Sequence, residues 1–178
     1  MKRLLLVLAV LAIVGGFYAL HKKPADLYAP GAYCAFCDEK VLDAQKFYED
    51  DLVLALYTHR PIFPGHCLVI TKRHVPRFEE LSEEEALRID QILKKVDLAV
   101  SPTYGTSSYL LLQKNGREAG QSVPHLHFHY IPRKAGDDSF LGFFYHMALA
   151  NLKKPIEPHE MQGNVLQLKD RMRTAGEY

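Results

Sequence analysis

The segment that most constrains this chain spans residues 121–133 and reads QSVPHLHFHYIPR. His125, His127 and His129 alternate in it with apolar residues, and such alternation is the side-chain period of a β-strand. The pattern predicts a strand with all three imidazoles on one face and the apolar side chains on the other. Because a strand rises about 3.3 Å per residue, successive histidines lie roughly 6.6 Å apart, within reach of one extended ligand or one metal site.

The residues just before this strand predict a turn that binds an anion. Residues 115–122 supply two glycines and several small polar side chains, in the order NGREAGQS. Backbone N–H groups exposed in such a turn form a concavity for anions, so a phosphate beside the histidines is the favoured ligand. The alternative is a three-histidine metal site of a binding protein or an oxygenase. Such sites usually add a carboxylate ligand, and residues 130–134 contain none.

Together these residues resemble the histidine triad (HIT) family of nucleotide hydrolases and transferases. The segment NGREAGQSVPHLHFHYIPRKAGD is most similar to the fragile-histidine-triad branch, and shorter matches upstream extend the resemblance over residues 33–132. The resemblance implies an α+β fold in which a five-stranded, mainly antiparallel sheet carries one main helix. It also implies a homodimer.

The resemblance further implies the chemistry. A neutral imidazole can attack phosphorus at pH 7, and the family gives this role to the residue matching His127, through a covalent nucleotidyl-histidine intermediate that water releases. His129 would bind the phosphate and assist the leaving group. Gln121, Ser122 and Val123, with the backbone N–H groups around them, would bind the non-bridging oxygens of the phosphate.

Two positions depart from the family's pattern. Relatives usually have Asn or Gln at Lys114, where it contacts ribose or phosphate; a lysine can bind phosphate but cannot accept a hydrogen bond from ribose. The Asp or Asn that accepts the ribose hydroxyls falls at Thr58, which can still form a single hydrogen bond. Dinucleoside polyphosphates and nucleoside phosphoramidates therefore both stay candidate substrates.

Two other functions stay open at this point. The first is a nucleotidyltransferase of the same family, in which a second phosphate resolves the intermediate; those relatives have Gln where His129 stands, so His129 favours the hydrolase. The second is a non-catalytic, membrane-tethered protein that binds zinc or a nucleotide. Turnover that is lost in His127→Asn would separate the enzyme from the binding protein.

Cys34 and Cys37 form a Cys-x-x-Cys pair, which alone fits a redox pair, half of a zinc site or a disulfide. In some branches of the family, such a pair holds a structural zinc with the histidine of a Lys-x-His segment and the first triad histidine. These positions match His74 and His125 here. Two thiolates and two imidazoles are a ligand set that tetrahedral zinc prefers, so zinc is the expected cofactor.

The amino terminus predicts a membrane segment. Residues 4–20 contain no charge and lie between two basic pairs, at 2–3 and 22–23. As a helix they would span about 25 Å, the lower limit for crossing a bilayer. We expect a single-pass anchor at 1–23, with a cleaved signal peptide as the alternative, a tether at 24–32 and a HIT-like domain at 33–178. The sequence does not give the side of the membrane.

The rest of the chain predicts ordinary secondary structure. Strands are expected at 46–49, 52–57, 66–71 and 108–114, a helix at 83–100 behind a Ser82/Glu85 capping box, and a terminal helix at 157–173. We interpret His66 as a loop histidine near the sheet edge. The net charge of +1, without a long run of one sign, gives no indication of nucleic-acid binding.

Overall fold

The computed structural model describes residues 29 and 31–136, 140–150 and 152–175. The predicted anchor at 1–23 and most of the tether lie outside the described residues. Within the part that is described, no helix is long and apolar enough to cross a membrane. The chain divides into two units, Met1–Ala32 and Tyr33–Tyr178, and all the elements below belong to the second unit.

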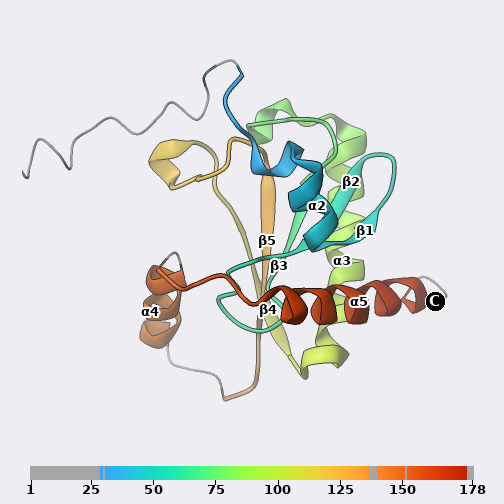
Figure 1. The fold of residues 1–178 in the computed structure, drawn as a ribbon, viewed down its shortest axis with the longest axis vertical. Helices are drawn as coiled ribbons and strands as arrows, with labels where there is room; N and C mark the ends of the chain where they lie inside the picture. Colours follow the sequence, from blue (N-terminus) through green and yellow to red (C-terminus); the bar gives the residue numbers. More distant parts are fainter. Residues whose placement is uncertain (1–28, 30, 137–139, 151, 176–178) are drawn as a thin grey trace, which may run out of the picture. The chain divides into compact units, whose positions relative to one another are not determined.

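The sheet of this unit has five strands in the order β1-β2-β3-β5-β4 (Figure 1). Every neighbouring pair is antiparallel, which confirms the predicted sheet. The strands are β1 (Lys46–Glu49), β2 (Val53–Tyr57), β3 (Cys67–Thr71), β4 (Ser108–Gln113) and β5 (His127–Arg133). β5 therefore lies in the interior of the sheet, where β3 and β4 fix its position from both sides, and β4 forms an edge.

The main helix, α3 (Glu83–Tyr104), begins at the predicted capping box. The Ser82 hydroxyl accepts from the Glu85 amide at 3.1 Å, and the Glu85 carboxylate accepts from the Ser82 amide at 2.9 Å. The helix runs beyond the predicted end to Gly105, whose left-handed backbone (φ 65°) terminates it. The terminal helix α5 (Pro158–Thr174) also confirms its prediction.

Two helices and three single turns were not predicted. α2 (Glu39–Gln45) begins at Asp38, whose carboxylate accepts from the Lys40 amide. α4 (Phe140–Ala150) is apolar along almost its whole length, so it lacks the helical periodicity that revealed α3 and α5. The short turns are η1 (Ala35–Cys37), η2 (Phe78–Glu80) and η3 (Arg117–Ala119).

The two faces of the sheet bury different sets of side chains. One face packs against α3 and α5 through a core that includes Ala55, Val69 and Tyr130. The other face is smaller and packs Leu68 and Ile70 against the region of η1. Since β3 pairs Leu68 with His129 and Ile70 with His127, the histidines of β5 point to this second face, away from α3.

Candidate active site and metal cluster

The three triad histidines lie where the alternation of the sequence predicts. His127 and His129 belong to β5, and His125 precedes the strand by two residues. Leu126 and Tyr130 are fully buried in the core beneath α3, on the opposite face. The sheet thus has the triad histidines on one face and the main hydrophobic core on the other.

His127 is held with one ring nitrogen available for reaction. Its Nδ1 lies 2.7 Å from the backbone carbonyl of His125. A carbonyl can only accept, so Nδ1 bears the proton and Nε2 keeps its lone pair. Burial lowers the pKa of His127 below its usual value, and the charge of Lys114 lowers it further, against the opposing effect of the carbonyl. The ring is therefore neutral at pH 7, with the lone pair of Nε2 available.

His129 is held in the opposite tautomer by His66. The Ile62 amide donates to His66 Nδ1 at 3.2 Å, which leaves the His66 proton on Nε2. That Nε2 lies 3.0 Å from His129 Nδ1, so it donates there, and the His129 proton must sit on its own Nε2. His129 thus presents a donor beside the lone pair of His127, and their rings are 4.9 Å apart.

Burial keeps this histidine pair uncharged. Desolvation, followed by repulsion from nearby imidazoles, lowers the pKa of His66 to about 3 and that of His129 to about 2. The expectation that His66 is a loop histidine near the sheet edge was wrong about its surroundings, because the side chain is only 3% exposed and contacts His129. Only the pairing of β3 with β5 brings these residues together, 63 positions apart.

A cavity of about 630 Å³ opens in front of these rings. Its lining includes His66, His127 and His129, together with four of the predicted substrate-binding residues, namely Thr58, Lys114, Ser122 and Val123. Lys114 follows β4 and lines the same cavity, and its Nζ lies 3.7 Å from the point where a Cβ on Gly120 would stand. The fold therefore brings cationic, hydroxyl and imidazole groups to one hollow from four separate segments.

Gln121 is the one predicted substrate- or phosphate-binding residue that is not part of this lining. Its side-chain oxygen accepts from the Gly116 amide at 2.7 Å, and its nitrogen donates to the Pro76 carbonyl at 2.9 Å. Gly116 and Gly120 have φ values of 98° and 80°, a conformation that side chains other than glycine rarely adopt. Gln121 thus holds the glycine turn in shape while Ser122 faces the cavity.

A second cluster forms where η1 meets the start of the triad. The ligand atoms of Cys34, Cys37, His74 and His125 all lie within 4.8 Å of one another. Individual sulfur–nitrogen distances are 3.6 Å from Cys34 to His125, 3.6 Å from Cys37 to His125 and 3.3 Å from Cys37 to His74. A tetrahedral zinc with ordinary bond lengths separates sulfur from nitrogen by about 3.5 Å. The predicted ligands therefore lie close enough together that they could hold a metal ion.

The surroundings of His125 point its free nitrogen at this cluster. Its Nε2 donates to the Thr71 carbonyl at 2.8 Å, so the lone pair is on Nδ1, the atom that faces both cysteines. Burial lowers the pKa of His125 to about 4, so the ring is neutral, as a ligand must be. Burial and the adjacent Cys37 thiol raise the pKa of Cys34 to about 12, and a bound cation would offset this by stabilising the thiolate.

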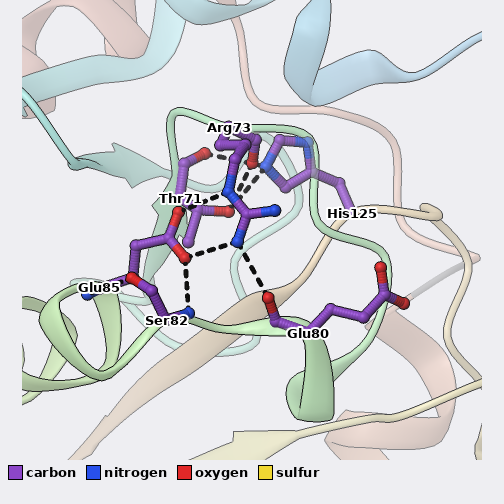
Figure 2. A network of polar contacts seen from close by, with 6 residues as sticks. All are labelled: Thr71, Arg73, Glu80, Ser82, Glu85 and His125. Carbon is purple, nitrogen blue, oxygen red and sulfur yellow. Dashed lines mark hydrogen bonds and ion pairs between the residues drawn. The ribbon is translucent and has the colours of Figure 1, made fainter.

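The loop that contributes His74 is tied to the start of α3. Figure 2 shows the Arg73 guanidinium between the Glu85 carboxylate and the backbone carbonyl of Glu80. Arg73 reaches the two Glu85 oxygens at 3.0 and 2.7 Å, and its own carbonyl accepts from the Thr71 hydroxyl. The capping box of the main helix and the outer partners of the metal cluster thus form one network.

This geometry agrees with what comparison with known proteins finds. The HIT domain model matches residues 39–136, which is more than half of the chain. The chain belongs to the HIT domain family.

Named relatives also support this membership, and the matches cover different shares of their lengths. An adenosine 5'-monophosphoramidase of Schizosaccharomyces pombe is 35% identical over 131 residues, covering 72% of this chain and 90% of that protein. A bifunctional bis(5'-adenosyl)-triphosphatase/adenylylsulfatase of Arabidopsis thaliana is 38% identical over 103 residues, covering 58% of this chain. The chain spans only 57% of the length of the Arabidopsis protein.

Solved HIT structures show the same fold. A hypothetical histidine triad nucleotide-binding protein of Sulfolobus tokodaii has a TM-score of 0.64 and 26% identity, with coverage of 79% of this chain and 93% of that one. A zinc-bound histidine triad protein of Mycobacterium smegmatis has a TM-score of 0.61 and 24% identity, with coverage of 79% and 94%. The HIT domain match ends at residue 136, so α4 and α5 lie beyond it.

Proposed function

We propose that this HIT protein is a nucleotide hydrolase that cleaves a phosphoanhydride or phosphoramidate through a covalent intermediate on His127. The observation that supports this most is the pair of opposite tautomers facing one cavity, a lone pair on His127 and an N–H on His129. The phosphoramidase and triphosphatase activities in the names of the yeast and plant relatives belong to the same reaction class.

The first step forms a bond between His127 Nε2 and phosphorus. The bond from phosphorus to the leaving group breaks, and the leaving group keeps the electron pair and takes up a proton. The His125 carbonyl stabilises the cation that forms on His127, since it accepts from Nδ1 at 2.7 Å. His129 and Lys114 supply an N–H and a positive charge to the oxygens that become more negative.

In the second step, water attacks the same phosphorus. The electron pair of the nitrogen–phosphorus bond returns to His127, and the proton that water releases balances the one taken by the leaving group. Ser122 and Val123, at the end of the glycine turn, line the cavity at the phosphate. Thr58 is 8% exposed and lines the same cavity, where its hydroxyl would replace the ribose-binding carboxylate of relatives.

The test is a panel of adenosine phosphoramidate, diadenosine triphosphate and a nucleotide sugar, assayed with the protein and with His127→Asn. We expect hydrolysis of at least one compound by the unaltered protein. His127→Asn should lose turnover by a factor of 10³ or more while it still binds that compound, because only the nucleophile is removed. A variant that kept turnover would refute the assignment, and release of a phosphorylated product only in the presence of a second phosphate would favour the transferase.

We propose that the ion held by Cys34, Cys37, His74 and His125 is zinc, in a structural role. The ligand types and the 3.3–3.6 Å spacings support this, because zinc prefers sulfur and nitrogen in a closed tetrahedron. When bound, zinc would link η1 to the start of β5. Elemental analysis of the purified protein should give one zinc per chain, and Cys37→Ser should lower it at least tenfold, whereas Cys67→Ser in the core should not.

We propose that the protein forms a homodimer through β4. This strand lies at the edge of the sheet and exposes Tyr109, Leu110 and Leu111 to solvent by 45%, 39% and 42%. An edge with apolar side chains can extend a sheet across two chains. Light scattering should report a dimer, and Leu111→Lys should give a monomer; a wild-type monomer would refute this.

We propose that residues 4–20 anchor the chain to a membrane. Their uncharged sequence between basic flanks supports this. Full-length protein should sediment with membranes after alkaline washing, and deletion of residues 1–23 should release it. Full-length protein in the wash would contradict the anchor, and a shortened product that lacks the N-terminal segment would contradict it in favour of the cleaved signal peptide.

A further inference from the structure

The helix beyond the HIT match builds one wall of the catalytic cavity. On the inner side of α4, Met147 and Ala150 line the cavity, and Phe143 is buried behind them. They belong to one apolar cluster with side chains from three other segments, which are Ile62, Phe63, Leu112 and Ile131. The part of this cluster that lines the cavity is called the α4 compartment below, and it consists of Ile62, Leu112, Ile131, Met147 and Ala150.

Ring contacts hold α4 in this position. The rings of Phe63 and Phe143 stack with centroids 6.2 Å apart. The Arg133 guanidinium, at the end of β5, lies over both of them at 5.1 and 5.0 Å. The wall is thus attached to the strand that carries the nucleophile.

The α4 compartment lies toward the leaving-group side of His127. Alternate residues of β5 share a face, so His127, His129 and Ile131 follow one another along the cavity in steps of about 6.6 Å. Phe36 contacts the His127 ring from the other end, at 5.3 Å between centroids. Because His129, the donor for the leaving group, stands between His127 and Ile131, a group that leaves past His129 enters the α4 compartment.

The walls of this compartment favour an apolar leaving group. All five of its side chains are hydrocarbon or thioether, and the polar residues His59 and Arg60 that line the same cavity adjoin Thr58 and do not belong to this apolar cluster. A polyphosphate placed among the five side chains would lose hydration without a partner from them. The Lys114 ammonium group lies beside Gly120 of the glycine turn, at the proposed phosphate site. An alkyl or aryl group would instead gain from burial against Met147, whose flexible side chain adapts to varied shapes.

We propose that the α4 compartment binds the leaving group, and that the substrate is a nucleotide whose phosphorus bears an uncharged apolar amine or alcohol. This rests on the proposed hydrolase. In the reaction, the bond from phosphorus to the nitrogen or oxygen of that group breaks as the bond to His127 forms. The amine or alcohol leaves with the electron pair and a proton, and water completes the hydrolysis.

The test compares kcat/KM of the full chain for three substrates that share one nucleotide: unsubstituted adenosine phosphoramidate, its N-hexyl derivative and diadenosine triphosphate. We expect the N-hexyl compound to be preferred over the other two at least tenfold, because several methylenes are buried. Equal rates, or a preference for either other substrate, would overturn the inference and leave the hydrolase standing. Hydrolysis of none of the three would count against the hydrolase and the inference together.

Variants of α4 test whether the α4 compartment causes the preference for the N-hexyl substrate. In Met147→Glu, which puts a charge into the compartment, the ratio of the N-hexyl to the unsubstituted kcat/KM should fall toward one. Leu141→Glu, on the same helix but 78% exposed, should keep the wild-type ratio. Ala150→Leu, which fills the compartment without adding a charge, should lower the same ratio. It provides a second test in case Met147→Glu does not fold. An unchanged ratio in both compartment variants would overturn the inference.

Discussion

Acid should unfold this protein largely through His66 and His129. An unfolded histidine has a pKa of about 6.5, whereas burial lowers these two to about 3 and about 2. As pH falls, the unfolded chain therefore takes up protons first. Their contribution to stability is complete above about pH 6.5 and is lost progressively as the pH falls toward the folded-state values.

The magnitude follows from these pKa values. Between pH 8 and pH 5.5, each histidine that stays neutral in the folded state lowers the unfolding free energy by about 1.4 kcal/mol, so the pair removes about 2.8 kcal/mol. Both side chains are largely buried, so solvent screening reduces this little. This loss of unfolding free energy is of the same order as a large mutational effect and is readily measured.

The assay is urea unfolding followed by circular dichroism at pH 8 and pH 5.5, with the wild type, His66→Gln and the double variant His66→Gln/His129→Gln. The wild type should lose about 2.8 kcal/mol more than the double variant over this range, and His66→Gln should lie between them. Protonation of the histidines that do not neighbour the pair cancels in the comparison. Equal losses in all three proteins would refute the buried, neutral pair.

Three further outcomes follow from particular contacts. Glu85→Ala should lower the unfolding free energy by about 2 kcal/mol, because it removes a capping hydrogen bond and the partly exposed ion pair with Arg73. Glu84→Ala, in the same helical turn, should change the unfolding free energy by less than about 0.5 kcal/mol. Thermal melts of both variants check this. Gln121→Leu should unpair the Gly116 amide and the Pro76 carbonyl, loosening the glycine turn and raising KM about tenfold, as steady-state kinetics would report. The proposed zinc site predicts that a strong chelator lowers the melting temperature of the wild type and leaves that of Cys34→Ser unchanged.

Local patterns in the sequence predicted the elements that local forces decide. The alternation at His127 and His129 gave the strand and its two faces, and the Ser82/Glu85 spacing gave the start of the main helix. Both signals act over a few residues, so they can be read without knowing the fold. α4 lacks any such signal, because a helix that is apolar on all sides has no 3.6-residue pattern.

Contacts between distant segments could not be read in the same way. His66 meets His129 across 63 positions, and Cys34 meets His125 across 91. The proposed metal ligands were predicted only through the resemblance, because relatives with the same fold bring the matching positions together. Gln121 is the opposite case. Its position in the motif predicts a phosphate ligand, yet its buried side-chain amide bonds to the Gly116 amide and the Pro76 carbonyl instead.

Formation of a bond between His127 and phosphorus can be tested directly. The protein would be mixed with its best substrate, quenched in alkali after milliseconds and digested, and the peptide containing residues 121–133 analysed by mass spectrometry. A mass increase of one nucleoside monophosphoryl group, located by fragmentation on His127, is the predicted result. Rapid product formation with no adduct on His127 at any quench time, or with the group on another residue, would contradict the account.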